Sequence, residues 1–144
     1  MAQTTTRIAA TPDRVFAVLA DPWTYERWVV GCKEIRDADE AWPAPGATFH
    51  HSVGIGPFSV SDTTTVIESE PPRRIVLRAR AWPAGVARVE IDLAEDGAGT
   101  TEAVMRELPV SGPPATLHNP LQEQLIQRRN AESLRRLRQL AEQP

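Results

Sequence analysis

The pattern that most constrains the fold is a series of short alternating segments through the middle of the chain, followed by one long helical pattern. From Cys32 to Leu108, polar and apolar residues alternate with period two, and stretches containing Gly or Pro separate the segments. Successive side chains of a strand point to opposite faces, so this pattern predicts an antiparallel sheet with one apolar face. The predicted strands are residues 33–38, 47–54, 57–69, 73–82, 86–95 and 100–108.

The N-terminal part predicts one further strand and two short helices. Residues 3–9 are rich in threonine and form the predicted strand. Thr11, Pro12 and Asp13 then follow in the order typical of an N-cap, a first helical position and a first helical turn. Pro22 ends this helix, because the residue before a proline disfavours the helical conformation. A second short helix is predicted over residues 23–29.

An apolar stripe predicts a long helix over residues 119–143, and this stripe is interrupted in its middle. Between Ile126 and Leu134, the positions that continue the buried side are Asn130 and Ser133. The helix is therefore expected to present a small polar patch toward the sheet.

Composition favours a single cytoplasmic domain spanning residues 1–144. This length can bury an adequate core, and Cys32 is the only cysteine, which excludes an internal disulfide and suits a reducing compartment. The net charge of -3 gives no long-range attraction for nucleic acid, and no stretch approaches the ~20 apolar residues of a membrane span.

Glutamates alternate with the arginines of the long helix, which predicts a solvated face with local ion pairs. These arginines are Arg128, Arg129, Arg135, Arg136 and Arg138.

Four stretches resemble the START-related (SRPBCC) superfamily, which includes polyketide cyclases and birch-pollen-allergen-like proteins. They are TPDRVFAVLADPWTYERW at 11–28, ESEPPRRIVLRAR at 68–80, GTTEAVMRE at 99–107 and RNAESLRRL at 129–137. The resemblance covers essentially the whole chain and implies the helix-grip fold of the α+β class. In that fold a curved seven-stranded antiparallel sheet grips a long C-terminal helix, and two short helices lie between the first two strands. It also implies an apolar cavity between sheet and helix.

Half of the aromatic residues lie between residues 11 and 29, where the two short helices are predicted. These helices would close one end of the implied cavity, so their aromatic side chains could serve both as a plug and as a ligand wall. Phe16 is expected to be a core residue. For Trp28, core packing and a place on the cavity wall are equally open.

His51 is the best single candidate for proton chemistry. It alternates with Phe49 and Val53, so it is expected to face the cavity, while His50 points to the opposite face. The two histidines therefore cannot bind one metal, and neither a metal nor a cofactor is expected. An inward histidine is more often a hydrogen-bonded core group than a catalyst, and that alternative stays open.

Two carboxylates are further candidates. Glu107 follows Ala103 and Met105 at period two, so it is expected on the inner face, where burial would disfavour its charged form unless an arginine pairs with it. A strand-end residue in water is the alternative. The direction of Asp62 is equally open. It shares one face of its strand with Val60, Thr64 and Val66, while Thr63, Thr65 and Ile67 lie on the other face.

Three functions are compatible with these observations. The first is the binding of a small hydrophobic molecule of lipid, aromatic or polyketide type, by a protein that is either monomeric or a homodimer. The second is an enzyme of the polyketide cyclase, aromatase or dehydratase type, in which His51, Asp62 or Glu107 moves protons. The third is an interaction module like the Hsp90-activator branch of the superfamily, with a vestigial cavity. The expected ligand-binding residues are Trp28, Phe49, His51, Val53, Met105, Glu107 and Asn130.

Overall fold

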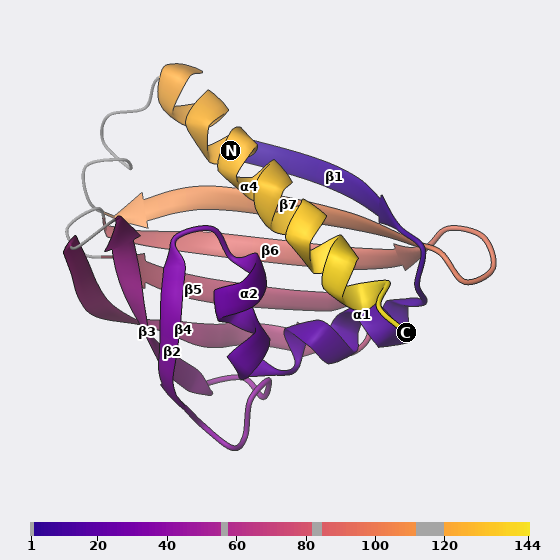
Figure 1. Cartoon of the computed structure of the whole chain (residues 1–144), viewed down its shortest axis with the longest axis horizontal. Helices are drawn as coiled ribbons and strands as arrows, with labels where there is room; N and C mark the ends of the chain where they lie inside the picture. Colours follow the sequence, from indigo (N-terminus) through magenta and orange to yellow (C-terminus); the bar gives the residue numbers. More distant parts are fainter. Residues whose placement is uncertain (1, 56–57, 82–84, 112–119) are drawn as a thin grey trace.

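One antiparallel sheet curves around a long helix, and of the short helices one lies at the C-terminal end of that helix and another beside its middle (Figure 1). The computed structural model describes residues 2–55, 58–81, 85–111 and 120–144, without the side chains of residues 53–55, 58–60 and 81. Within these residues, seven strands form the sheet in the order β1-β7-β6-β5-β4-β3-β2. The predicted helix-grip architecture of the α+β class is confirmed. The elements are β1 (Ala2–Ile8), α1 (Pro12–Leu19), the 3-10 helix η1 (Pro22–Thr24), α2 (Tyr25–Trp28), β2 (Cys32–Ala38), β3 (Thr48–Ile55), β4 (Phe58–Glu70), β5 (Arg74–Ala81), β6 (Gly85–Glu95), β7 (Thr101–Ser111) and α4 (Pro120–Ala141).

The start of α1 has the predicted cap. The Thr11 hydroxyl accepts a hydrogen bond of 3.2 Å from the Arg14 N–H, and Pro12 occupies the first helical position. The predicted second helix is instead two pieces, because the Asp21 carboxylate accepts from the Trp23 N–H and starts the separate turn η1 before α2 begins.

Strand β7 runs three residues past the predicted end at 108, to Ser111. It does so although Pro109 cannot donate a hydrogen bond. Strand β1 begins at Ala2, opposite Glu107, so among the described residues Pro109 has a paired neighbour only on its β6 side, at Ala87. The remaining strand ends agree within one or two residues, while the predicted ends at 57, 82 and 119 lie outside the described residues.

The core lies between the inner face of the sheet and α4. Ile91 and Leu93 of β6 are buried there, as their alternation with charged residues predicts. Helix α4 contributes Leu134 and Leu137, which are fully buried, and it contacts β1, β7, α1 and α2. Burial of this apolar stripe against the sheet is the main force that holds the helix in place.

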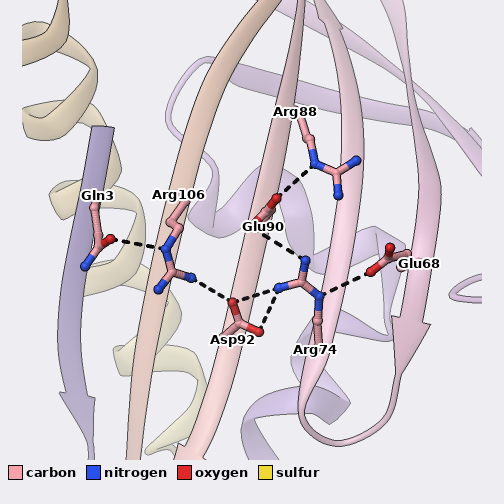
Figure 2. A network of polar contacts seen from close by, with 7 residues as sticks. All are labelled: Gln3, Glu68, Arg74, Arg88, Glu90, Asp92 and Arg106. Carbon is pink, nitrogen blue, oxygen red and sulfur yellow. Dashed lines mark hydrogen bonds and ion pairs between the residues drawn. The ribbon is translucent and has the colours of Figure 1, made fainter. Parts of the chain in front are cut away.

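A network of charged groups ties the strands together on the outer face, away from α4 (Figure 2). Asp92 is its centre: Arg74 donates to both carboxylate oxygens and Arg106 donates to Oδ2, each at 2.9 Å. The network reaches five strands, and every arginine in it has a carboxylate partner. Its members are Gln3, Glu68, Arg74, Arg88, Glu90, Asp92 and Arg106.

Candidate functional site

Buried polar side chains collect on the inner face of the sheet and on the side of α4 that covers it. This placement is unusual, because a face that packs against a helix is normally apolar. The residues are His51 on β3, Asp62 and Thr64 on β4, Glu107 on β7, and Asn130 and Ser133 on α4. All the predicted inward polar residues are therefore buried.

His51 has one bonded and one unbonded ring nitrogen. Its Nε2 shares a hydrogen bond of 3.0 Å with the Thr64 hydroxyl, whereas Nδ1 has no partner. Burial lowers the pKa of the imidazole, and this effect outweighs the opposing influences of the Thr63 backbone and of the Asp62 charge. His51 is therefore neutral at pH 7, with one nitrogen available to a bound molecule. His50 is exposed, as alternation predicts.

The lowered pKa of His51 should make stability depend on pH. The unfolded chain titrates at the ordinary value of 6.5 and the folded protein below it, so the unfolded state binds more protons in that interval. The free energy of unfolding should therefore fall as the pH drops through 6.5 toward the folded-state pKa. We expect His51→Gln, whose amide can still bond Thr64, to lose this pH dependence in urea unfolding curves. His50→Gln is the control and should keep it; an unchanged profile in His51→Gln would contradict the assignment.

Asp62 lies directly opposite His51 in the β3–β4 pair, but the structure does not join the two in a hydrogen bond. One oxygen of the carboxylate accepts from the Thr63 N–H at 2.9 Å and lies 3.6 Å from Nε of Arg80. The sequence left open which face of the sheet Asp62 occupies. It is buried on the same face as His51, because the two residues are opposite each other in the strand pair. A catalytic relay in which a carboxylate orients the histidine is not formed.

Glu107 is buried, and its partner comes from α4. The Arg129 guanidinium donates to Glu107 Oε2 at 2.5 Å. The sequence predicts that burial disfavours the charged form of Glu107 unless an arginine pairs with it, and Arg129 is that arginine. Arg129 is exposed, as a solvated face predicts, but the prediction of a local ion pair was wrong for it, because its partner lies on β7. The prediction is confirmed for Arg135 and Arg136, which pair with Glu132 one turn away.

His51 and Glu107 lie on the same face, but three strands separate them. The sheet order places β6, β5 and β4 between β7 and β3. Four steps of about 4.8 Å put the two backbones about 19 Å apart along the sheet. This topology agrees with the expectation that the two residues do not transfer protons as a pair.

Trp28 belongs to a buried aromatic cluster that reaches the candidate histidine. Its ring centroid lies 4.8 Å from that of Tyr25, Tyr25 contacts both Trp42 and Phe49, and Phe49 contacts His51 at 5.2 Å. The Tyr25 hydroxyl and the Trp42 indole both donate to the Leu19 carbonyl, whereas the Trp28 indole N–H has no partner. Trp28 is thus both a core residue and a source of an unused donor.

Four buried polar atoms lack a hydrogen-bond partner among the described residues, and they are spread over β1, α2, β3 and α4. Leaving such a group unsatisfied costs about 1 to 3 kcal/mol. Native proteins satisfy the great majority of buried polar groups, so several exceptions in one layer require an explanation. The atoms are Thr4 Oγ1, Trp28 Nε1, His51 Nδ1 and Asn130 Nδ2.

The interrupted stripe of α4 faces inward, as predicted. The Ser133 hydroxyl accepts from the Val30 N–H at 3.0 Å, which fixes this part of α4 beside the end of α2. Asn130 precedes Ser133 by about one helical turn, so both lie on the side of α4 nearest Trp28. Sequence reasoning missed Thr4, because Thr4, Thr5 and Thr6 follow one another and give no sign of which points inward.

Other site chemistries find little support in the described part of the chain. The Cys32 thiol is buried, and burial together with the Glu26 charge raises its pKa to about 12, so it is a poor nucleophile at neutral pH. No group of His, Cys, Asp and Glu side chains within the described ranges has the arrangement of a metal site. No helix in those ranges is long and apolar enough to cross a membrane.

A family model described as polyketide cyclase / dehydrase and lipid transport matches residues 1–142. The chain belongs to this family. A comparison of the sequence with curated proteins found no match. Membership of the polyketide cyclase / dehydrase and lipid transport family agrees with the resemblance found in the sequence.

Solved structures share the fold along nearly the full chain. Protein CV1439 from Chromobacterium violaceum is 22% identical, with a TM-score of 0.71, and the match covers 99% of this chain and 96% of that one. Protein NE0264 from Nitrosomonas europaea is 17% identical, with a TM-score of 0.71 and coverage of 96% and 93%. The Zhui aromatase/cyclase from Streptomyces sp. R1128 is 19% identical, with a TM-score of 0.70 and coverage of 98% and 92%. At these identities the likeness concerns the fold alone.

Proposed function

We propose that this domain binds a small, mostly apolar molecule that carries acceptor oxygens, between the inner face of the sheet and α4. The observation that carries the proposal is the pair of unused donors at Trp28 Nε1 and Asn130 Nδ2. An indole N–H can only donate, and so can an amide nitrogen. Carbonyl, ether or phenolic oxygens of a ligand would satisfy both, which is the chemistry of an oxygenated aromatic or a polyketide-like compound.

The surrounding residues suit such a ligand. Phe49 and Met105 are buried on the same layer and supply apolar surface, and His51 Nδ1 can accept from a ligand hydroxyl or donate to a carbonyl according to its tautomer. Glu107 is held by Arg129 and is proposed to orient a polar end of the ligand. The side chain of Val53, the remaining predicted contact, lies outside the described part of the chain.

Native mass spectrometry of the purified protein tests the proposal. We expect a population of heavier species whose excess mass matches a small organic molecule and disappears on denaturation. A protein that carries no such mass, and that also takes up no oxygenated aromatic when these are added, would contradict it. That outcome is the one expected if the protein is instead an interaction module with a vestigial cavity.

An enzyme of the cyclase, aromatase or dehydratase type is the second candidate function, and the family membership together with the state of His51 supports it. A neutral imidazole with a free nitrogen can take a proton from an acidic carbon next to a carbonyl and return it to a departing hydroxyl. Under this candidate, His51→Gln should abolish ring formation from a linear polyketide while the variant still binds the product. Equal turnover by His51→Gln and by the native protein would exclude His51 as the proton carrier.

The location and the assembly of the protein complete the proposal. We place it in the cytoplasm, because its lone Cys32 is a buried free thiol, as expected in a reducing compartment. We propose a small molecule rather than nucleic acid as its partner, since the net charge is -3. The residues of the proposed site all belong to one chain, so both a monomer and a homodimer could bind the ligand.

A further inference from the structure

A separate pocket lies on the outer face of the sheet, on the side away from α4. Its volume is about 480 Å³, and its walls come from β4, β5, β6 and the end of β7. The buried inner-layer residues and this pocket are on opposite sides of the sheet, so one ligand cannot occupy both. The lining residues are Thr63, Thr65, Arg78, Arg80, Gly85, Val86 and Ser111.

One of the two arginines that line this pocket has no carboxylate partner among the described residues. Arg78 lies directly opposite Arg88 in the β5–β6 pair, and like charges in that position repel. Arg88 is neutralised by Glu90 at 2.9 Å, but the side chain of Arg78 makes no ion pair or hydrogen bond with any described residue. Arg80 is exposed and has only Asp62, at 3.6 Å. The pocket therefore has a guanidinium group available to a ligand.

The contrast with the rest of the outer face supports this interpretation. In the neighbouring network every arginine has a carboxylate partner, and Arg88 lies at its edge (Figure 2). Arg78 is the next arginine beyond that edge, across the strand pair from Arg88. A chain with net charge -3 does not attract anions in general, so an unpaired arginine in a concave site is a local feature.

Hydroxyl groups supply the remaining contacts of this pocket. Thr63, Thr65 and Ser111 can each donate a hydrogen bond, and Thr65 already shares one of 2.9 Å with Thr48. A carboxylate offers two oxygens in one plane, whereas a phosphate offers three or four in a tetrahedral arrangement. Guanidinium groups and hydroxyls that surround one concavity from several strands fit the tetrahedral anion better.

We propose that this outer pocket is an oxyanion site that prefers a phosphate group, held by Arg78 and Arg80 with the hydroxyls of the adjoining strands. The site does not depend on the function proposed for the inner layer. Its ligand is inorganic phosphate or the phosphate of a small phosphorylated compound.

The test is a titration of the native protein with inorganic phosphate at constant ionic strength, followed by the backbone amide NMR signals of β4, β5 and the end of β7. We expect saturable shifts confined to the pocket. Arg78→Gln should weaken binding about tenfold, because it removes a charge-assisted hydrogen bond. Thr63→Val should weaken it by a smaller factor, and acetate should bind more weakly than phosphate.

Arg128→Gln is the matched control, since Arg128 is an exposed arginine of α4, which covers the other face of the sheet. It should bind phosphate as the native protein does. Circular dichroism of each variant verifies folding. Shifts that do not saturate, an equal loss in Arg128→Gln, or acetate binding as tight as phosphate binding would overturn the proposal.

Discussion

Phe16→Ala is expected to lower the free energy of unfolding by about 3 to 5 kcal/mol, the usual cost of removing a buried aromatic side chain. Phe16 is 5% exposed and packs in the core formed by α1, the sheet and α4. The surroundings cannot fully close around the space left by the ring, so both the transfer free energy and the packing contacts are lost. Urea unfolding at neutral pH measures the difference.

Trp23→Ala provides the control for this substitution, because Trp23 comes from the same aromatic-rich stretch but is 51% exposed. We expect a change within about 0.5 kcal/mol, as is usual for surface positions. Equal losses from the two variants would mean that Phe16 is not a core residue.

Asn130→Leu is expected to separate stability from ligand recognition. Asn130 is buried in α4 and its amide nitrogen has no partner, so replacing it with an apolar residue removes an unsatisfied donor. The free energy of unfolding should stay the same or rise by about 1 kcal/mol. Binding of an oxygenated aromatic should weaken about tenfold, while binding of the matching hydrocarbon should not weaken. Isothermal titration calorimetry with both compounds measures the two affinities.

Gln124→Leu is the control on the same helix, since Gln124 is exposed. It should alter neither the stability nor the preference for oxygenated compounds. If Asn130→Leu instead destabilised the protein by about 1 to 3 kcal/mol, its amide would be satisfying buried backbone groups and would not be free for a ligand.

The architecture could be predicted because its signals are local. Alternation of Val89, Ile91 and Leu93 with charged residues identified the inner face of β6, and the Thr11 and Pro12 pair marked the start of α1. The interrupted stripe of α4 correctly placed Asn130 and Ser133 against the sheet, because helical periodicity alone decides which residues share a face.

Pairings between distant segments could not be predicted in the same way. Arg129 pairs with Glu107 across 22 positions of sequence, and helical spacing suggested only partners one turn away. The buried position of Asp62 likewise depends on its register opposite His51, which the sequence of a single strand does not specify. The outer pocket needs residues from four strands, so no single stretch of sequence carries its signal.

The central claim is that the unused donors of the inner layer receive an oxygen-bearing ligand, and the indole N–H signals of the four tryptophans test it directly. Two ligands with one bicyclic skeleton, 1-tetralone and tetralin, differ in the presence of a carbonyl oxygen. Trp28→Phe identifies the Trp28 signal. With tetralone we expect this signal to move downfield, as a hydrogen bond forms, while the Trp42 signal, already bonded to the Leu19 carbonyl, stays in place. Tetralin should not produce the downfield shift. A Trp28 signal that ignores tetralone, or that responds equally to both compounds, would contradict the account.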